Sequence, residues 1–345
     1  MLSSASLTSL TTLLLPAVSA YGLHWPEAGI SDSVITDFVT RAHAAGITTS
    51  YVVGGWTGSQ YFSTHVSTAT SRATFARTLV SVMQQYNFDG IDIDWEYPGQ
   101  QGEGNNVVSP NDSANFLLFL QTLRSVAGVN ASLSISINVA GMVGADGNTL
   151  TDLSSFAAVL DYVTTMSYDI TGTWSSFTGS KLPLSAACAR PSNPLSIATG
   201  ISYLQSAGFA ANHILVGMPA YSYSYYVQGP LTQQTCPDGT KSSLYQYATV
   251  GSTCGTYIGN GPQFLYRDIY NSGYFTSQSG YRRVLDQSSQ TWILWNPTTL
   301  SFIPLVRAIR QGFKIDPTTS VPTLRKREIV REHLERRRRF VIPTI

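Results

Sequence analysis

The stretch that decides the fold of this chain is residues 88–98, which reads FDGIDIDWEYP. Its three acidic residues after the glycine, Asp92, Asp94 and Glu96, alternate with apolar neighbours. On a β-strand, residues two apart point to the same face and lie about 6.6 to 6.8 Å from each other. The alternation therefore predicts a strand with one acidic and one apolar face. Burying like charges in a column is unfavourable unless the carboxyls share protons or meet a cation, so we expect this column to serve chemistry rather than stability.

Apolar runs of strand length recur on both sides of this stretch. They cover residues 49–56, 90–97, 133–141, 162–170 and 213–223. Their nearly continuous apolar character is typical of strands whose two faces are both covered. Their alternation with helical patterns predicts a parallel sheet with helices outside it. The periodicity is compatible both with a closed eight-stranded barrel and with an open doubly wound sheet.

Three helical patterns separate these strands, each with a recognisable start and stop. The ranges and the residues expected to face the core are 32–46 with Val34, Phe38 and Ala42, 109–128 with Phe116, Leu120 and Leu123, and 193–208 with Ile197, Ile201 and Leu204. A glycine ends each of them, as is common at helix C-termini. After residue 223 the composition changes to Tyr, Ser, Gln and Gly, which predicts an inserted subdomain.

In a barrel, the three acids would lie in the interior and rise towards the C-terminal rim, where barrel enzymes have their active sites. Glu96 is then the acid nearest the rim. A negatively charged Asp94 below it would keep Glu96 protonated, so that Glu96 could donate a proton to a glycosidic oxygen. Two other interpretations stay open: an edge strand with its polar face in water, and a metal ion held by the three carboxylates.

The composition of the chain narrows its class of partner. With 345 residues it suits one large domain or two modest ones, and its formal net charge of +1 argues against binding to nucleic acid or anionic lipid. The charge is unevenly distributed, because residues 1–302 hold 10 basic and 16 acidic side chains and residues 303–345 hold 11 and 4. The first part is rich in Ser, Thr, Gly and Tyr, which is typical of secreted proteins that bind neutral, hydroxyl-rich ligands.

The N-terminal segment predicts secretion. Residues 7–18 form a short apolar run, and Val18, Ser19 and Ala20 place small residues where a signal peptidase cleaves. The run is too short to span a bilayer, which needs about 20 apolar residues. We therefore expect residues 1–20 to be a signal peptide and the protein to be extracellular, with no membrane partner. A buried N-terminal helix is the alternative interpretation.

The three cysteines fit an oxidising compartment with one disulfide and one remaining thiol. Cys236 and Cys254 are 18 residues apart in a stretch rich in Gly, Ser and Thr, so we expect them to pair and Cys188 to be left over. Closing a loop of that length would contribute about 3 kcal/mol. No Cys-x-x-Cys is present and the five histidines are scattered, so no metal site is expected. Asn111 and Asn130 begin Asn-x-Ser sequences that accept N-glycans.

The acidic pattern Asp89-Gly-x-Asp92-x-Asp94-x-Glu96 resembles the signature of glycoside hydrolase family 18, the chitinases, which are (β/α)8 barrels. Three further motifs resemble those of the same family and follow in the right order on strand ends. They are Gly54-Gly55-Trp56 for strand three, Met166-Ser-Tyr168-Asp169 for strand six and Gly217-Met218-Pro-x-Tyr221 for strand seven. The similarity is closest to fungal members and covers residues 25–302.

The resemblance implies an α/β fold, a (β/α)8 TIM barrel with a small α+β insertion subdomain before the last strand. We expect the catalytic barrel at residues 21–223, the insertion subdomain at 224–290, the end of the family-like region at 291–302 and a basic tail at 303–345. The chain has little room for the first and second strands of the family and lacks the eighth. We therefore expect a barrel that is incomplete at both ends, and a tail that is non-native, disordered or helical.

The resemblance also implies a reaction, the retaining hydrolysis of β-1,4-linked N-acetylglucosamine polymers in which the substrate's own acetamido oxygen attacks the anomeric carbon. By this analogy Glu96 protonates the leaving oxygen and later deprotonates water. Asp94 orients the acetamido N–H, Asp92 shares a proton with Asp94, and Tyr168 holds the acetamido carbonyl. The resemblance thus implies an endo-type, monomeric chitinase without a cofactor, with chitin or chitooligosaccharides as its partner.

Eight further residues are implied to bind the sugar chain. They are Trp56, Asp89, Tyr97, Met166, Asp169, Trp174, Met218 and Tyr221. For the aromatic ones, packing in a core is the alternative interpretation. Two positions depart from the family pattern: Val52 replaces a serine, and Ser222-Tyr223 replaces the Gly-Arg expected after Tyr221. Two other functions stay open, a lectin-like member that binds chitin without turnover and an inactive truncated product.

Overall fold

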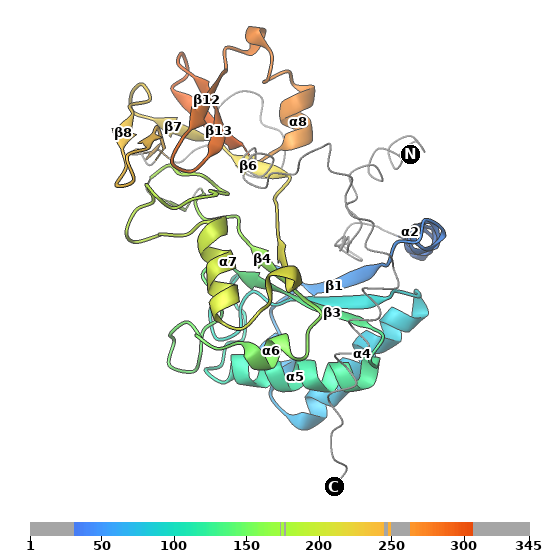
Figure 1. Cartoon of the computed structure of the whole chain (residues 1–345). Coiled ribbons are helices and arrows are strands. Elements are labelled where there is room, and N and C mark those ends of the chain that lie inside the picture. Colours follow the sequence, from blue (N-terminus) through green and yellow to red (C-terminus); the bar gives the residue numbers. More distant parts are fainter. Residues whose placement is uncertain (1–30, 173, 176, 245–247, 250–262, 306–345) are drawn as a thin grey trace. The chain divides into compact units, whose positions relative to one another are not determined.

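The computed structural model describes residues 31–172, 174–175, 177–244, 248–249 and 263–305. Within them, one sheet has five parallel strands in the order β1-β2-β3-β4-β5 (Figure 1). The strands are β1 (Ser50–Gly54), β2 (Gly90–Asp94), β3 (Ser132–Asn138), β4 (Tyr162–Met166) and β5 (Ile214–Val216). Each predicted strand segment overlaps one of them, with β3 beginning one residue before its segment, and their order in the sheet follows the chain.

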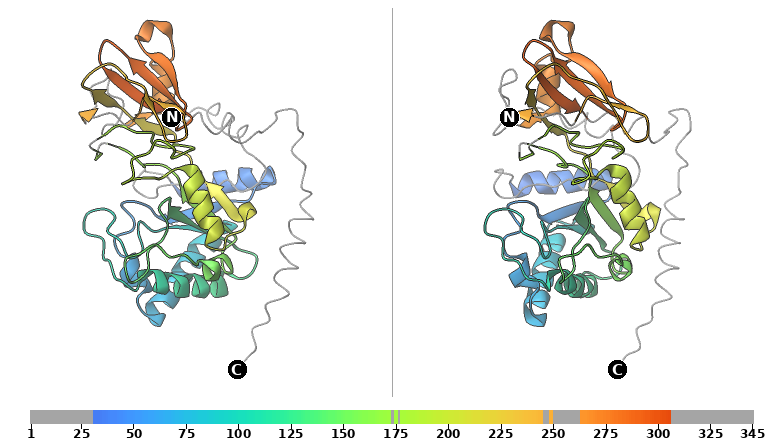
Figure 2. Two further views of the ribbon diagram at one scale, coloured as in Figure 1. Left: turned by 60° about the vertical axis from the view of Figure 1, so that its left-hand side comes forward. Right: turned by 90° about the vertical axis from the view of Figure 1, so that its left-hand side faces the viewer.

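Helices connect these strands. They are α2 (Asp32–Ala44), α3 (Phe62–Val66), α4 (Ala69–Gln85), α5 (Asp112–Ala127), α6 (Ser154–Ala157) and α7 (Ile197–Ser206), with a 3-10 turn at Ala211–His213. Helices α4, α5 and α6 lie on one face of the sheet (Figure 1), and the turned views of Figure 2 keep them on that side. Helix α5 buries the three residues predicted for it, Phe116, Leu120 and Leu123. Strands and helices therefore alternate as predicted.

The register of β2 against β3 separates the two faces of the acidic strand. Asp92 lies opposite Ser134 and Asp94 opposite Ser136. The apolar residues between the acids belong to the core that the helices cover, and Ile93 is 1% exposed. The core of the sheet thus lies on one side of β2 and the carboxylates on the other.

Helix α2 differs from the prediction in the face it buries. Its buried residues are Ile35 and Val39, whereas Val34, which we expected to face the core, is 53% exposed. Phe38 is partly buried and packs against the same core. The stripe is shifted by one residue because Ile35 and Val39 form an i, i+4 apolar pair that competes with Val34 and Phe38.

Helix α7 begins later than predicted. Its N-cap is Ser196, whose hydroxyl accepts a hydrogen bond from the backbone N–H of Thr199 at 3.1 Å. A serine at this position satisfies a free N–H group of the first turn. Asn193, which we expected at the start of this helix, donates through Nδ2 to the carbonyl oxygen of Ile170 at 2.8 Å.

The chain from residue 221 onwards forms a second, antiparallel sheet in the order β10-β7-β14-β13-β12. Its strands are β7 (Tyr225–Val227), β10 (Ala248–Thr249), β12 (Arg282–Asp286), β13 (Thr291–Asn296) and β14 (Ser301–Leu305). Two short strand pairs and a helix accompany it: β6 (Tyr221–Tyr223) with β11 (Gln263–Leu265), β8 (Gln234–Thr235) with β9 (Lys241–Ser242), and α8 (Tyr266–Asn271). Residues 291–302, expected to close the family-like region, thus belong to the same sheet as β7 and β12.

A buried carboxylate joins the loops of this second sheet. Asp286, at the end of β12, is 1% exposed. Its two oxygens accept hydrogen bonds from the hydroxyls of Ser242 at 2.8 Å, Ser288 at 2.9 Å and Ser289 at 2.7 Å. They also accept from the backbone N–H groups of Ser243 at 2.7 Å and Ser289 at 2.9 Å. The charge is therefore matched by five donors.

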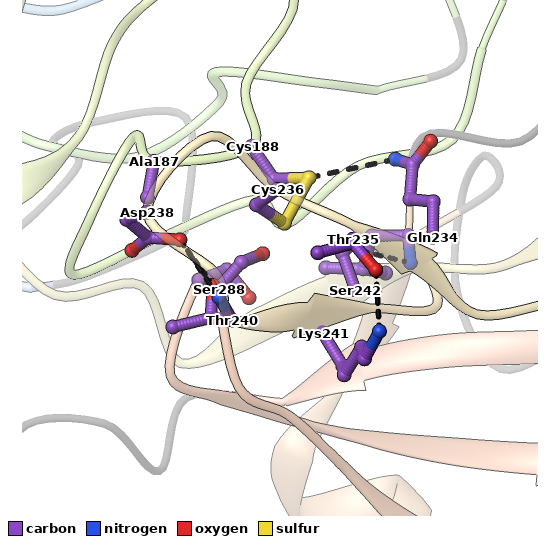
Figure 3. Close-up of a disulfide and its surroundings, with 12 residues drawn as sticks. Ala187, Cys188, Gln234, Thr235, Cys236, Asp238, Thr240, Lys241, Ser242 and Ser288 are labelled. Atoms are coloured by element: carbon purple, nitrogen blue, oxygen red, sulfur yellow. Dashed lines mark hydrogen bonds between the residues drawn. A yellow bond between two sulfur atoms is a disulfide. The ribbon is translucent and has the colours of Figure 1, made fainter.

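The disulfide joins Cys188 to Cys236, and not Cys236 to Cys254 as predicted (Figure 3). The Cα atoms of the pair are 5.0 Å apart, which a disulfide bridges readily. Cys254 lies outside the described residues. The prediction was wrong because it favoured the shorter loop in the sequence, whereas the fold brings Cys188 beside the β8–β9 pair across a separation of 48 residues.

The signal peptide predicted at 1–20 lies outside the described residues. The basic tail predicted at 303–345 starts too early, because residues 303–305 are the end of strand β14 and Ile303 and Leu305 are buried. The rest of that prediction, residues 306–345, lies outside the described residues. None of the helices within the described ranges has the length and apolar character needed to span a bilayer. In the same part of the chain, no group of three His, Cys, Asp or Glu side chains is placed to hold a metal ion.

Candidate active site

The three acids of the β2 segment lie along one face and become more exposed towards its C-terminal end. Asp92 is 3% exposed, whereas Asp94 and Glu96 are partly buried. The Asp92 carboxylate accepts hydrogen bonds from the hydroxyls of Ser134 and, at 3.1 Å, Ser136. The acids share one face as the alternation predicts, and Glu96 is the outermost of them.

Burial is the main influence on the protonation of these acids. It raises the pKa of Asp92 and, with the charges of Glu96 and Asp92, raises the pKa of Asp94 to about 7. Burial also raises the pKa of Glu96, a hydrogen bond with Tyr97 lowers it, and the charge of Asp169 raises it further. Glu96 thus shifts in the expected direction; the charge of Asp169 contributes to its shift, and the interaction between Asp94 and Glu96 raises the pKa of Asp94.

Asp94 has an unused acceptor. Its Oδ1 is buried and has no hydrogen-bond partner among the residues that the structure describes. Because an unpaired buried acceptor is unfavourable, native proteins leave few of them, and those few point to a functional role. This oxygen is suited to accept an N–H group from a ligand.

Two side chains from flanking loops hold the backbone of Glu96. Ser59 Oγ accepts a hydrogen bond from the N–H of Glu96 at 2.9 Å and donates to the carbonyl oxygen of Gly55 at 2.8 Å. Asn106 Nδ2 donates to the carbonyl oxygen of Glu96 at 3.0 Å. Neither residue was predicted from the sequence, because only the position of Ser59 shortly after the Gly-Gly-Trp motif sets it apart from other serines.

The paired glycines allow β1 to approach β2 at the acidic end. Gly54 has a φ of +112°, and a Cβ atom there would overlap the carbonyl oxygen of Asp94. The N–H of Gly55 donates to the same carbonyl at 2.7 Å. Trp56 follows directly and is 50% exposed, so this turn presents an aromatic ring beside the end of β2.

A second group of side chains, the Asp169 cluster, consists of Asp169, Lys181, Tyr221 and Tyr223. The Asp169 carboxylate accepts hydrogen bonds from the hydroxyls of Tyr221 at 2.7 Å and Tyr223 at 3.2 Å. Its Oδ1 lies 2.6 Å from Nζ of Lys181, whose side chain is 3% exposed. Burial lowers the pKa of Lys181 to about 7, against the opposing effect of Asp169. Lys181 was not predicted from the sequence, because it lies in a loop without periodicity or motif.

Tyr168 and Tyr97 bring hydroxyl groups to the acids. Burial, followed by the charges of Asp94 and Glu96, raises the pKa of Tyr168 well above its ordinary value. Burial and the charge of Glu96 do the same for the pKa of Tyr97, which hydrogen-bonds to Glu96 and Asn138. Both hydroxyls therefore stay protonated and act as donors.

Apolar side chains implied to bind sugar differ in exposure. Trp174 is 60% and Met218 56% exposed, whereas Met166 at the end of β4 is 7% exposed. The Trp174 ring meets the Tyr223 ring edge to face, with 5.5 Å between centroids. Trp174 is thereby joined to the Asp169 cluster, whereas the burial of Met166 leaves little of its side chain to contact a sugar.

Asp89, which we expected to bind sugar, lies elsewhere. It precedes β2, at the end of the strand opposite Glu96. Its Oδ2 accepts a hydrogen bond from the backbone N–H of Thr49 at 2.7 Å and lies 2.8 Å from Nε2 of His43. Asp89 therefore ties α2 to the strand starts, and the structure gives it this role instead of the predicted one.

The two asparagines of the Asn-x-Ser sequences are at the surface. Asn111 is the N-cap residue of α5, and Asn130 lies in the loop before β3. Both residues are exposed. Their glycosylation stays a prediction.

Several known proteins are similar to this chain in sequence. The family described as "Glycosyl hydrolases family 18" matches residues 29–310. A "chitinase-like effector" of Moniliophthora roreri is 32% identical over 289 residues, which cover 78% of this chain and 70% of the relative. "Chitinase A1" of Niallia circulans is 30% identical over 271 residues, which cover 76% of this chain and 37% of the relative. The chain thus spans between about a third and about two thirds of the length of these curated relatives.

Solved structures share the fold. A chitinase from Rhizomucor miehei superposes with a TM-score of 0.69 at 26% identity, covering 80% of this chain and 77% of that one. An Ostrinia furnacalis Group IV chitinase, solved in complex with allosamidin, superposes with a TM-score of 0.67 at 22% identity, covering 81% and 71%. The family match and the parallel sheet together imply a TIM-barrel-like α/β fold. The chain belongs to family 18 of the glycosyl hydrolases.

Proposed function

We propose that this protein is a secreted, endo-type chitinase that hydrolyses β-1,4-linked N-acetylglucosamine polymers. The observation that carries the proposal is the state of Glu96, a partly buried carboxyl with a raised pKa at the outer end of the acidic face. Its backbone is held on both sides, so the side chain starts from a fixed position. Membership of family 18 and the chitinases among the relatives support the same substrate class.

The first step is the cleavage of the glycosidic bond. Glu96 donates its proton to the glycosidic oxygen, and the C–O bond to the leaving chain breaks. The carbonyl oxygen of the substrate's own acetamido group attacks the anomeric carbon, which gives an oxazolinium ion and requires no carboxylate nucleophile. A general acid must be protonated at the working pH, and burial provides this at Glu96 by raising its pKa.

Asp94 and Tyr168 are suited to hold the acetamido group during this step. The unpaired Oδ1 of Asp94 accepts the acetamido N–H, and the protonated hydroxyl of Tyr168 donates to the acetamido carbonyl. Asp92 lies below Asp94 on the same face, and the pKa of each carboxyl is raised. The two acids therefore share a proton and need not carry two negative charges at once.

The second step returns the site to its starting state. Glu96, now a carboxylate, takes a proton from a water molecule, and the water oxygen attacks the anomeric carbon as the oxazolinium ring opens. Two displacements at the same carbon give retention of configuration. The proton acquired by Glu96 is the one needed for the next cleavage.

Exposed side chains around the acids are suited to bind a sugar chain. Trp56, Trp174 and Met218 are each at least half exposed. Aromatic and apolar walls with a few placed polar groups are typical of small-molecule sites, and the apolar faces of sugar rings pack against such walls. Tyr221 and Asp169 add polar groups at the same side of the site.

A second function, binding of chitin fragments without turnover, is favoured by one observation. Two Moniliophthora relatives carry the name "chitinase-like effector". In this chain Glu96, Asp94 and Tyr168 are all present, so hydrolysis is the first proposal.

Hydrolysis of a chromogenic chitooligosaccharide by the wild type and by Glu96→Gln tests the proposal. Glutamine keeps the size of the side chain and removes its proton, so we expect a loss of about 100- to 10,000-fold in kcat. Glu103→Gln is the matched control, because it makes the same change in the loop after β2 and outside the acidic face. Equal rates for wild type and Glu96→Gln would refute the mechanism, and binding without hydrolysis by the wild type would favour the second function.

A further inference from the structure

Lys181 is the only lysine or arginine among the buried residues of the described part of the chain. It lies in the loop between β4 and α7, which folds back on itself beside Asp169. The backbone N–H of Ile170 donates to the carbonyl oxygen of Lys181 at 3.4 Å, and Thr171 Oγ1 donates to the carbonyl oxygen of Ser180 at 3.1 Å. These two hydrogen bonds fix the backbone of Lys181 next to Asp169, the residue that follows Tyr168.

Two aromatic rings and one carboxylate surround the ammonium group. Nζ of Lys181 lies 2.6 Å from Asp169 Oδ1, 2.9 Å from the centroid of the Tyr221 ring and 4.3 Å from that of the Tyr223 ring. The same two tyrosines donate their hydroxyls to Asp169. Aromatic faces attract a cation, and this attraction grows when water is excluded. The four side chains therefore hold one another in a closed arrangement.

This arrangement is not explained by stability alone. Taking the ammonium group of Lys181 out of water is costly, and the side chain of its partner Asp169 is still 36% exposed, so the attraction between them is screened by water. Burial also lowers the pKa of Lys181 to about 7, so water exclusion acts against the charge that the pair requires. Because stability does not account for the buried Lys181, we look for its role in its partner, Asp169.

The partner acts on the proposed acid. The charge of Asp169 raises the pKa of Glu96. The ammonium group of Lys181, 2.6 Å from Asp169, offsets the negative charge of Asp169 and so reduces its effect on Glu96. Lys181 therefore limits how far Asp169 raises the pKa of Glu96, and its main part is to hold the Asp169 carboxylate in place.

We propose that Lys181 is a positioning residue of this site, which orients the Asp169 carboxylate against Tyr221 and Tyr223 and offsets the negative charge that Asp169 places beside Glu96. The inference rests on the proposed function, because it gives Lys181 a part in the reaction of Glu96. Besides Glu96, the ionisable side chains that interact with members of the cluster are Tyr168 and Tyr225.

The pH dependence of kcat/KM tests this role with the wild type, Lys181→Met and Lys181→Arg. Methionine keeps most of the side-chain volume and removes the charge. We expect Lys181→Met to lose about 10- to 100-fold in kcat/KM at pH 5, the range set by a charged hydrogen bond, and Lys181→Arg to recover most of this loss. Lys241→Met, the same change at an exposed lysine of β9, is the matched control and should behave as the wild type.

The change with pH separates this role from packing. Above pH 7 the wild-type lysine loses its proton, so the gap between wild type and Lys181→Met should narrow, while the ratio of Lys181→Arg to wild type should rise. A wild-type rate for Lys181→Met at pH 5 would overturn the proposal. The proposal would also be overturned if the difference in kcat/KM between wild type and Lys181→Met stayed constant with pH and Lys181→Arg were as slow as Lys181→Met. Should Lys181→Met fail to fold, the ratio of Lys181→Arg to wild type against pH decides alone.

A second measurement needs no activity and so separates this inference from the proposed function. The chain has four lysines, so the 13Cε resonance of Lys181 can be assigned from its loss in Lys181→Arg. We expect the pKa of Lys181 to fall below its wild-type value of about 7 in Asp169→Asn, because burial remains while the anionic partner is gone. An unchanged pKa would overturn the pairing. Failure of the wild type to hydrolyse chitooligosaccharides would count against the proposed function and not against this result.

Discussion

The two sheets of this protein each contain an aspartate with buried oxygen atoms, and the two aspartates differ in how many hydrogen bonds they accept. In the antiparallel sheet, Asp286 is 1% exposed and its two oxygens accept five hydrogen bonds from serine hydroxyls and backbone N–H groups. In the parallel sheet, Asp94 has a buried Oδ1 without a partner among the described residues, and its pKa is raised to about 7. A saturated carboxylate stabilises its surroundings, whereas an unsaturated one is available for a ligand or a proton.

The largest effect on this comparison is expected from Asp94→Asn. The change removes a charge and a proton site at the acidic face, so we expect kcat/KM on a chromogenic chitooligosaccharide to fall about 100-fold or more. The free energy of unfolding should stay the same or rise, because the neutral amide is less costly to bury next to Asp92. Kinetics and urea unfolding on the same preparation check both halves. A large loss of stability would mean that Asp94 is a structural carboxylate like Asp286.

For Asp286→Ala we expect the reverse of Asp94→Asn, namely a loss of stability without a loss of activity. Five buried donors lose their acceptor, and each unpaired donor is unfavourable by about 1–3 kcal/mol before relaxation, so we expect a loss of about 3 kcal/mol in the free energy of unfolding. The folded fraction should keep its kcat. Asp238→Ala, at an exposed turn between β8 and β9, is the matched control for urea unfolding and should change stability little. Equal midpoints for the two variants would contradict the structural role of Asp286.

The pH dependence of stability gives a smaller effect with a definite sign. The pKa of Asp94 is about 7 in the folded protein and about 3.8 in the unfolded chain. The folded state therefore binds more protons between these values, and the stability that Asp94 contributes is complete below about pH 3.8 and is lost as the pH rises through about 7. We expect the difference in Tm between Asp94→Asn and wild type to grow from pH 4 to pH 8. A difference that does not change with pH would show that Asp94 titrates normally.

The smallest effect is expected from Asp89→Asn. Asp89 lies at the end of β2 opposite Glu96 and contacts His43 and Thr49, so its loss should lower Tm by a few degrees and leave kcat/KM within about twofold of the wild type. Thermal unfolding and kinetics separate the two readouts. A tenfold loss of activity in a folded Asp89→Asn variant would restore the sequence-based expectation that this residue serves the substrate.

Local patterns in the sequence predicted the elements that depend on local physics. The alternation of Asp92, Asp94 and Glu96 fixes which side chains share a face, because this follows from strand geometry alone. The three buried positions that were predicted for α5 follow from helical periodicity in the same way. In α2, two overlapping stripes were available, and packing against the sheet selected Ile35 and Val39.

Contacts between distant segments could not be predicted. Lys181, in the loop between β4 and α7, contacts the rings of Tyr221 and Tyr223 in β6, and no spacing in the sequence indicates this contact. The arginine expected after Tyr221 is absent, and the cation of the site comes from a segment that the motifs do not cover. The disulfide was assigned to the wrong partner of Cys236 for the same reason, since a pairing across 48 residues depends on the tertiary fold.

The most direct test of the central claim is the anomeric form of the first product. The claim is that Glu96 protonates the leaving oxygen while the substrate's own acetamido group attacks. Time-resolved proton NMR of N-acetylchitohexaose with the wild-type protein should show new reducing ends in the β form before mutarotation, and Glu96→Gln should release none on the same timescale. Initial release of the α form, or equal release by Glu96→Gln, would contradict the account.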